Sequence, residues 1–271
     1  YIIFFVMEVF KMSEYELFAI KYADRDAKAN DHFYGHPDPH EDYSMPMDYF
    51  IWVAKSENQT IVIDVGFNEE VAEKRNRNFI KSPVELLKEI GIEPETVDYV
   101  IITHLHYDHI GNLSHFPNAK YIIQEKELSF WTGKYAGKPH FKSHVEKEDI
   151  LYLVDQNFSN RVIFVDGNVE VFPGVHLYLV GGHSPGLQMV KVNTPKGNVL
   201  LTSDAAHFYK NINEERPFII VVDLPAMYDG FDLIKKLEKE CVHIVPGHDP
   251  MVIELFQSPN SKLQDLVVKI E

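Results

Sequence analysis

Cysteine is almost missing from this 271-residue sequence. Cys241 is its single thiol, which excludes a disulfide within the chain and fits a reducing compartment. We therefore expect a cytoplasmic protein. Cys241 lies in the strand-like run 241–245, so it is interpreted as a small core residue rather than a catalytic thiol.

Basic residues are also scarce. The chain has 26 Lys and Arg against 41 Asp and Glu, a formal net charge of −15. Nucleic acids and anionic membranes bind basic surfaces, so neither is expected as a partner. No run approaches the ~20 apolar residues that cross a bilayer. The apolar residues 1–12 lack the flanks of a signal peptide and are interpreted as a cloning or annotation remnant, with the start at Met7 or Met12.

Low-complexity linkers and short-period repeats are absent too, so we expect one domain over residues 1–271. Strand-like and helix-like segments alternate, as in layered α/β folds. Two groups of strands suggest two facing sheets with helices outside. The main predicted strands are 15–22, 47–54, 60–65, 97–102, 119–123, 161–165, 169–172, 175–180, 188–193, 198–202 and 241–245. The main predicted helices are 82–91, 229–240 and 258–270.

The stretch from Thr103 to Asn112 is the most informative part of the sequence. It follows the strand-like run 97–102 and holds four potential metal ligands, His104, His106, Asp108 and His109. Groups at a strand's carboxyl end face the crevice where α/β folds bind ligands. Imidazole and carboxylate groups bind zinc-like ions, and a shared dication removes the cost of burying them. We therefore predict a metal site, with a short helix beginning at Ile110.

Three later segments each place a similar residue after a strand-like run. His183 lies in a glycine-rich turn, Asp204 follows the run 198–202, and His248 follows the run 241–245. Together with the first stretch they supply five histidines and two aspartates. This set is large enough for two metal ions that share a carboxylate.

Two segments leave alternatives open. Asp64 closes a predicted strand, where it either braces the metal site or is an ordinary turn residue. Residues 124–154 combine aromatic side chains with interrupting glycines. They are expected to form either a lid or pocket wall, or a surface helical hairpin.

The long polar loop 23–46 carries three histidines at a spacing of four, His32, His36 and His40. This spacing would place them on one face of a helix, but the intervening prolines exclude that helix. We therefore treat them as loop residues that could lie over the site, and metal binding by this loop is the less favoured alternative.

The order of the ligand-type residues resembles the metallo-β-lactamase superfamily over nearly the whole chain. The resemblance implies a four-layer αβ/βα sandwich, with two mixed β-sheets, helices on both outer faces and the metals at one edge. It also implies two divalent ions, by default Zn²⁺, although Fe, Mn or Co fit the same ligands. In this scheme one metal takes His104, His106 and His183, the other takes Asp108, His109 and His248, and Asp204 bridges them with a water or hydroxide.

Within the superfamily the sequence is most similar to the N-acyl homoserine lactone lactonases. Chain length, the Met-Pro-Met loop and the phrase Ser203-Asp204-Ala205 carry this likeness. True β-lactamases generally lack the bridging aspartate, and nuclease branches usually have extra domains and a basic surface. Many such lactonases have a tyrosine three residues after the bridging aspartate, where this chain has His207 and, two residues later, Tyr209.

The resemblance implies a hydrolase that opens the ester bond of a lactone by attack of a metal-bridging hydroxide. An N-acyl homoserine lactone is the candidate substrate, which would make the protein a quorum-quenching enzyme, and a homodimer is the assembly considered. The expected catalytic residues are Asp108, Asp204, His207 and Tyr209. The expected substrate-lining residues are Met45, Met47, Phe67, Phe130 and Trp131.

Two other classes of protein would use the same ligands. A glyoxalase II-like thioesterase or another carboxylic ester hydrolase would combine this metal site with a different pocket. A non-catalytic metal-binding or sensor protein would bind metals without turnover. A panel of lactones and acyl thioesters separates these classes.

Overall fold

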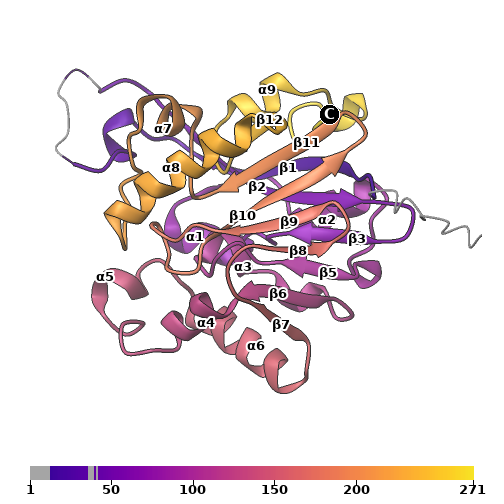
Figure 1. Ribbon diagram of the computed structural model, residues 1–271, viewed down its shortest axis with the longest axis horizontal. Coiled ribbons are helices and arrows are strands. Elements are labelled where there is room, and N and C mark those ends of the chain that lie inside the picture. Colours follow the sequence, from indigo (N-terminus) through magenta and orange to yellow (C-terminus); the bar gives the residue numbers. More distant parts are fainter. Residues whose placement is uncertain (1–12, 36–39, 41) are drawn as a thin grey trace, which may run out of the picture.

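Two β-sheets face each other in the structure, a computed structural model that describes residues 13–35, 40 and 42–271 (Figure 1). The first sheet has the strand order β13-β1-β2-β3-β5-β6-β7, with β4 paired to β1 outside this path. The second has the order β12-β11-β10-β9-β8. Both are mixed, since β3, β5, β6 and β7 pair in parallel, as do β11 and β12, and the other pairs are antiparallel. The strands are β1 (Glu16–Arg25), β2 (Met47–Lys55), β3 (Thr60–Ile63), β4 (Asn78–Phe79), β5 (Tyr99–Ile101), β6 (Lys120–Gln124), β7 (Val162–Val165), β8 (Val169–Phe172), β9 (Val175–Leu179), β10 (Gln188–Thr194), β11 (Gly197–Ser203), β12 (Cys241–Pro246) and β13 (Val267–Lys269).

Helices cover the outer faces of both sheets. In Figure 1, α8 lies across the second sheet, and α4 and α6 lie beside β6 and β7 of the first. The α-helices are α1 (Glu69–Arg75), α2 (Pro83–Glu89), α3 (Tyr107–Ile110), α4 (Glu125–Trp131), α5 (Pro139–Lys142), α6 (Lys147–Phe158), α7 (Tyr209–Glu214), α8 (Leu224–Glu238) and α9 (Met251–Leu255). Short 3₁₀ turns are η1 (Ala29–Asp31), η3 (Pro94–Thr96), η4 (Leu113–His115) and η5 (Ser261–Leu263).

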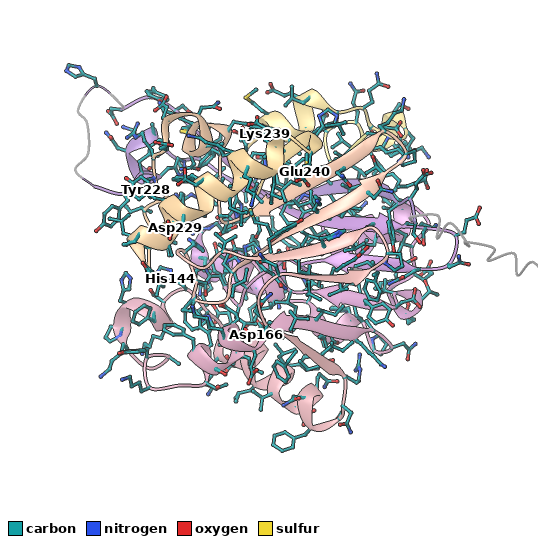
Figure 2. All side chains as sticks on the ribbon, viewed as in Figure 1. His144, Asp166, Tyr228, Asp229, Lys239 and Glu240 are labelled. Carbon is teal, nitrogen blue, oxygen red and sulfur yellow. The ribbon has the colours of Figure 1, made fainter. Side chains whose placement is uncertain are left out.

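Three buried apolar clusters fill the interfaces between the four layers. Strand side chains alternate between faces, so Ile61 and Ile63 of β3 enter the cluster between the sheets. Val62, between them, enters the cluster shared with α1, α2, α4 and α6. The third cluster packs α7 and α8 on the second sheet, for example through Phe231. Side chains fill these layers throughout (Figure 2). The four-layer αβ/βα prediction is therefore confirmed.

The predicted C-terminal helix over 258–270 is wrong. In its place the chain forms η5 and the edge strand β13, which pairs with β1 in the register Ile20 to Val267 and Phe18 to Lys269. Val267 and Val268 are both buried, on opposite faces of the sheet, which a strand allows. Pairing with β1, which is distant in the sequence, therefore determines the conformation of this segment.

Two further boundaries differ from the prediction. The short helix expected from Ile110 begins at Tyr107, so α3 itself carries Asp108 and His109. The helix predicted over 229–240 begins earlier, at Leu224, because Asp223 caps it by accepting from the amide of Ala226.

Residues 124–154 form α4, α5 and the first part of α6. Leu128 and Trp131 of α4 and Ile150 of α6 are buried in the cluster on the outer face of the first sheet. The two ends of this segment are thus packed on the first sheet, whereas α5 between them has no buried residue, so both a pocket wall and a surface helical hairpin stay predictions. The interpretations of residues 1–12 and of His36 lie outside the described residues. No helix within 13–35 or 42–271 has the length and apolarity needed to span a bilayer.

Candidate metal centre

The first four ligand-type residues lie directly beyond β5, which is buried on both faces. His104 and His106 follow the strand in an extended turn, and His106 is the N-cap residue of α3. Asp108 and His109 lie in the first turn of α3 and are therefore displaced from the two preceding histidines. Their exposed fractions run from 0% for His104 to 7% for Asp108, so the whole motif is inside the protein.

The remaining candidates come from loops of the second sheet. His183 lies between β9 and β10, Asp204 follows β11, and His248 follows β12. All three are buried. The structure thus brings together all seven predicted metal-ligand residues, at the edge where loops of the two sheets meet.

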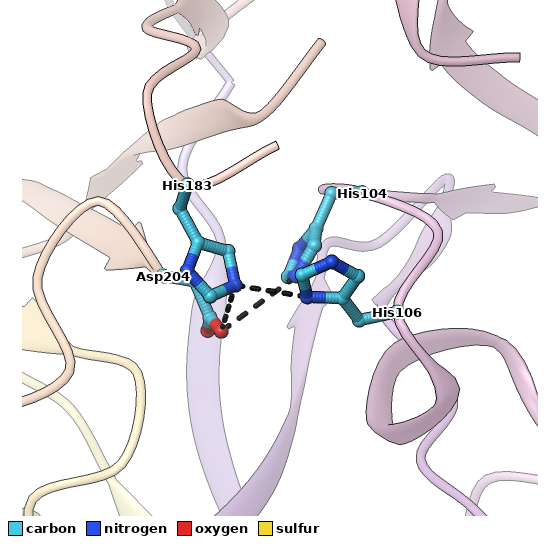
Figure 3. Close-up of side chains that lie close together, drawn as sticks. All are labelled: His104, His106, His183 and Asp204. Carbon is cyan, nitrogen blue, oxygen red and sulfur yellow. Dashed lines mark hydrogen bonds and ion pairs between the residues drawn. The ribbon is translucent and has the colours of Figure 1, made fainter. Parts of the chain in front are cut away.

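Four of these residues form a first cluster (Figure 3), His104, His106, His183 and Asp204. His183 Nε2 lies 2.9 Å from His106 Nδ1 and 3.1 Å from Asp204 Oδ2, and His104 Nε2 lies 3.6 Å from Asp204 Oδ2. Two ligands about 2.1 Å from one ion at a tetrahedral angle are about 3.4 Å apart. The observed spacing is therefore that of one coordination sphere.

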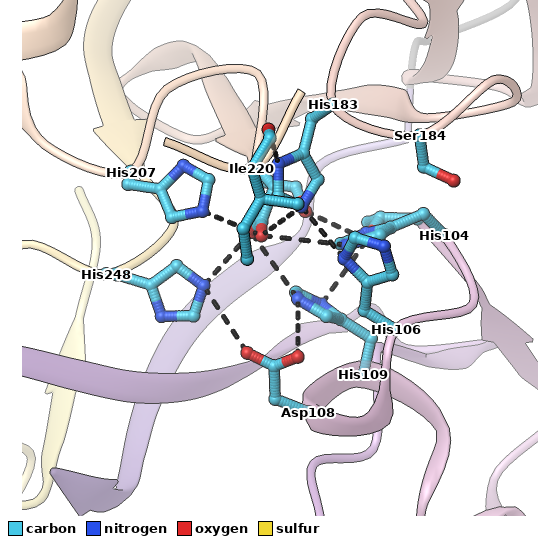
Figure 4. A network of polar contacts seen from close by, with 12 residues as sticks. His104, His106, Asp108, His109, His183, Ser184, His207, Ile220 and His248 are labelled. Carbon is cyan, nitrogen blue, oxygen red and sulfur yellow. Dashed lines mark hydrogen bonds and ion pairs between the residues drawn. The ribbon is translucent and has the colours of Figure 1, made fainter. Parts of the chain in front are cut away.

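Asp108, His109 and His248 form a second cluster (Figure 4). Asp204 also faces this cluster, since its Oδ1 lies 3.0 Å from His248 Nε2 and 3.4 Å from His109 Nε2. Asp108 lies 3.8 Å from His109 and 3.9 Å from His248. Each oxygen of Asp204 thus faces a different cluster, which is the arrangement of a carboxylate between two ions.

The imidazoles are oriented as metal ligands. His183 and His248 each donate an Nδ1–H to a backbone carbonyl, of Ile220 at 2.9 Å and of Asp48 at 2.8 Å, so their Nε2 lone pairs point into the site. Nε2 of His104 and of His109 is buried and has no hydrogen-bond partner among the described residues. Buried, unpaired ring nitrogens are costly unless a cation uses them. These residues therefore fit a pair of divalent ions.

Burial and the neighbouring charged groups together set the pKa values of the site. It lowers the pKa of His104 and of His106 well below the ordinary value, and neighbouring imidazoles add to the shift, so both rings are neutral ligands. Burial also opposes charge on His109, but three nearby carboxylates raise its pKa well above the ordinary value. The field at His109 therefore favours a cation at its Nε2, whether a proton or a metal ion.

Asp64 braces this site, which settles one open alternative. Its carboxylate accepts from the amide of Thr103 at 2.8 Å, from Thr103 Oγ1 at 2.7 Å and from His109 Nδ1 at 2.7 Å. Ser203, beside Asp204, donates its hydroxyl to Thr103 Oγ1 at 2.8 Å. One hydrogen-bonded chain therefore connects the metal loops of both sheets.

Glu127 on α4 is a further supporting residue that the sequence analysis missed. Its fully buried carboxylate accepts from the amide of Leu105 at 2.9 Å, from Ser184 Oγ at 2.6 Å and from the amide of Gly186 at 2.6 Å. Leu105 separates His104 from His106, and Ser184 follows His183. Glu127 thus joins the two loops of the first cluster, and a lone glutamate in a predicted helix gave no signal of it.

His207 and Tyr209 are placed very differently. His207 Nε2 lies 3.0 Å from Asp204 Oδ2, and its ring stacks on Phe218 with centroids 3.5 Å apart. Tyr209 lines a separate cavity beside β12 and α8, together with Cys241. Burial raises the pKa of Tyr209 to about 12 and that of the Cys241 thiol to about 11. The structure brings His207, but not Tyr209, to the ligand clusters.

The predicted substrate-lining residues are mostly packed in the core. Phe67 is fully buried among Tyr22, Tyr49 and Tyr107, and Met47 is buried in the same cluster. Trp131 is buried 5.5 Å from the ring of His106 and donates its Nε1–H to Glu127. Met45 and Phe130 are half-buried at the border of this cluster. Of the five predicted residues, these two keep part of their surface exposed, and a role in substrate binding stays a prediction.

Known proteins share this fold and sequence pattern. Residues 46–255 match the metallo-beta-lactamase superfamily, to which the chain therefore belongs. Among its relatives, an N-acyl homoserine lactonase from a Bacillus species is 33% identical over 220 residues, which cover 75% of this chain and 82% of that protein. N-acyl homoserine lactonase AiiA of Bacillus thuringiensis subsp. kurstaki is 30% identical over 213 residues, covering 73% and 80%.

Solved structures give the same likeness. A quorum-quenching N-acyl homoserine lactone lactonase superposes with a TM-score of 0.73 at 25% identity, over 88% of this chain and 93% of that chain. The seven buried ligand-type residues and the four-layer sandwich are thus found in a chain whose relatives are lactone hydrolases.

Proposed function

We propose that this protein is a metal-dependent hydrolase that opens a lactone ring, with N-acyl homoserine lactones as the first substrates to test. The observation that carries the proposal is the position of Asp204, which lies 3.1 Å from His183 through one oxygen and 3.0 Å from His248 through the other. The relatives named above act on N-acyl homoserine lactones, which supports the choice of substrate.

The proposed cofactor is a pair of zinc ions. One would be held by His104, His106 and His183, the other by Asp108, His109 and His248, with Asp204 between them. When bound, the ions would supply Lewis-acid chemistry that acidifies water and polarises an ester carbonyl.

The chain's own residues would move the protons. Although burial opposes its charge, the surrounding histidines hold the pKa of Asp204 well below its usual range, so it is an anionic acceptor. Asp204 would accept the proton released as the water oxygen attacks the carbonyl carbon. His207, in contact with the Asp204 carboxylate, would pass this proton to the alkoxide that leaves when the ring C–O bond breaks. Tyr209 takes no part in this scheme. The cytoplasmic location and the homodimer stay predictions from the sequence.

The test combines metal analysis of the purified protein with a pH-drop assay over lactones, acyl thioesters and simple esters. Lactone opening releases an acid, so the readout needs no chromophore. We expect two ions per chain and turnover of at least one lactone. Faster turnover of thioesters would assign the thioesterase class, and two bound ions without any ester hydrolysis would contradict the proposal.

A further inference from the structure

His144 lies on the connection between α5 and α6, beside the first ligand cluster. Figure 2 labels it. Its ring centroid is 5.3 Å from that of His106, yet it belongs to none of the three groups of candidate metal ligands, the third of which joins Asp204 and His248 to His207. Its Nε2 is buried and has no hydrogen-bond partner within the described part of the chain. An imidazole with an unused Nε2 therefore lies next to the metal site.

The backbone around His144 is held from two directions. Tyr107, inside the metal motif, donates its amide to the His144 carbonyl at 2.9 Å. Arg75 of α1 donates to the carbonyls on either side, of Ser143 at 2.9 Å and of Val145 at 3.4 Å. His144 thus has a fixed position relative to the motif.

Arg75 is itself fixed. Its guanidinium lies 3.8 Å above the ring of Tyr107 and donates to Glu146 at 2.8 Å. Lys74 donates to the other oxygen of the same carboxylate at 2.6 Å. Several groups therefore hold the segment 143–146, but none of them uses the His144 ring. A buried nitrogen without a partner costs free energy unless a group from outside the chain, a water or a ligand, meets it.

We propose that His144 contacts the substrate by donating a hydrogen bond from Nε2 to a carbonyl oxygen. This carbonyl belongs to the acid part of the ester bond that is broken and not to the alcohol part. The inference rests on the proposed function and adds a substrate contact to it. His207 contacts Asp204 from the second sheet, whereas His144 comes from the helical segment that covers the first. The two histidines would therefore act on different parts of one substrate.

Three variants of the metal-loaded protein test this contact. In His144→Gln the side-chain amide reaches the position of Nε2, in His144→Asn it stops near Nδ1, and His144→Leu has no donor. We expect kcat/KM for N-hexanoyl homoserine lactone to fall about 10- to 100-fold in the Leu and Asn variants and less than about 3-fold in the Gln variant. His115→Leu, which replaces an exposed imidazole on η4, is the matched control and should stay at the wild-type value.

Binding of the ring-opened N-hexanoyl-homoserine, measured by calorimetry, is the readout that does not require turnover. Its Kd should rise about 10-fold in His144→Leu at unchanged metal content. Arg75→Met should lower kcat/KM in the wild type but add little in His144→Leu, because Arg75 acts through His144.

Wild-type kinetics and product affinity in His144→Leu would overturn the inference and leave the proposed function intact. Loss of metal in proportion to activity would also overturn it, since His144 would then support His106. A wild-type protein that opens no lactone but binds the acid, more weakly in His144→Leu, would overturn the proposed function and support the contact. Binding of neither lactone nor acid would overturn both.

Discussion

The carboxylate of Asp64 lies 2.7 Å from Nδ1 of His109. This contact fixes the tautomer of His109, because Nδ1 must carry the proton that Asp64 accepts, and Nε2 is left to face Asp204. Asp64 itself has a left-handed backbone, with φ of 57°, which a non-glycine residue adopts at some cost. The turn after β3 is thus shaped to present one carboxylate to the metal motif.

Replacing Asp64 by Asn should weaken the second metal site while leaving the first intact. The neutral amide is a poorer acceptor for Nδ1–H, and partners of this kind typically change metal affinity about 10- to 100-fold. Titration calorimetry with Zn²⁺ on the metal-free protein measures it. Asp98→Asn, in an exposed turn of the same sheet, is the control. Equal affinities in wild type and Asp64→Asn would show that Asp64 only shapes the turn.

Replacing His106 by Ala should remove at least one metal ion and nearly all turnover. His106 Nδ1 lies 2.9 Å from His183 Nε2, so its loss opens the first cluster. Plasma emission analysis counts the ions, and the pH-drop assay gives the rate. His115→Ala, an exposed histidine of η4, should change neither quantity. Full metal content together with full rate in His106→Ala would mean that the ligand assignment is wrong.

Replacing Glu127 by Gln should destabilise the protein and loosen the first cluster. Glu127 accepts hydrogen bonds from Leu105, Ser184 and Gly186. The NH₂ group of glutamine is a donor, so it would face at least one of these donors without forming a hydrogen bond. Leaving a buried donor without an acceptor costs about 1–3 kcal/mol, so we expect a loss of about 2–4 kcal/mol in the free energy of unfolding. Urea unfolding measures it, with Glu125→Gln on the exposed face of α4 as control. A loss of unfolding free energy no larger than that of Glu125→Gln would show that the Glu127 carboxylate does not hold the two loops together.

Asp149 in α6 should make the stability of the protein depend on pH. Burial, with Glu146 and Glu148 nearby, raises its pKa from 3.8 to about 7. The folded state then holds this proton more tightly than the unfolded chain does. Its contribution to stability is therefore complete below about pH 4 and is lost as the pH rises through about 7.

Asp149→Asn removes this titration. The variant should be more stable than the wild type at pH 8, by at most about 4 kcal/mol, and the difference should disappear near pH 4. Thermal melts across this range measure the effect, with Asp155→Asn at an exposed position of the same helix as the control. A constant difference at all pH values would exclude a raised pKa for Asp149.

Local sequence signals predicted those parts of the fold and site that local chemistry decides. The hairpin of β2 and β3 and all seven candidate ligands fall where the sequence placed them, because strand alternation and ligand spacing are local. β13 was not predictable, since its conformation depends on pairing with β1 more than 240 positions away. Glu127 was missed for the same reason, as its partners come from two distant loops. The core positions of Phe67 and Trp131 also depend on neighbours that only the folded chain supplies.

His248, the last candidate ligand along the chain, is hydrogen-bonded to Asp48 of β2. Asp48 donates its amide to the carbonyl of His248 at 3.0 Å, and His248 donates Nδ1–H to the carbonyl of Asp48 at 2.8 Å. Two hundred positions separate these residues. During synthesis, therefore, a nascent chain that has emerged only as far as β11 lacks the second half of this pair. The ligand groups that contain His248 can therefore assemble only after β12 and the residues that follow it have left the ribosome.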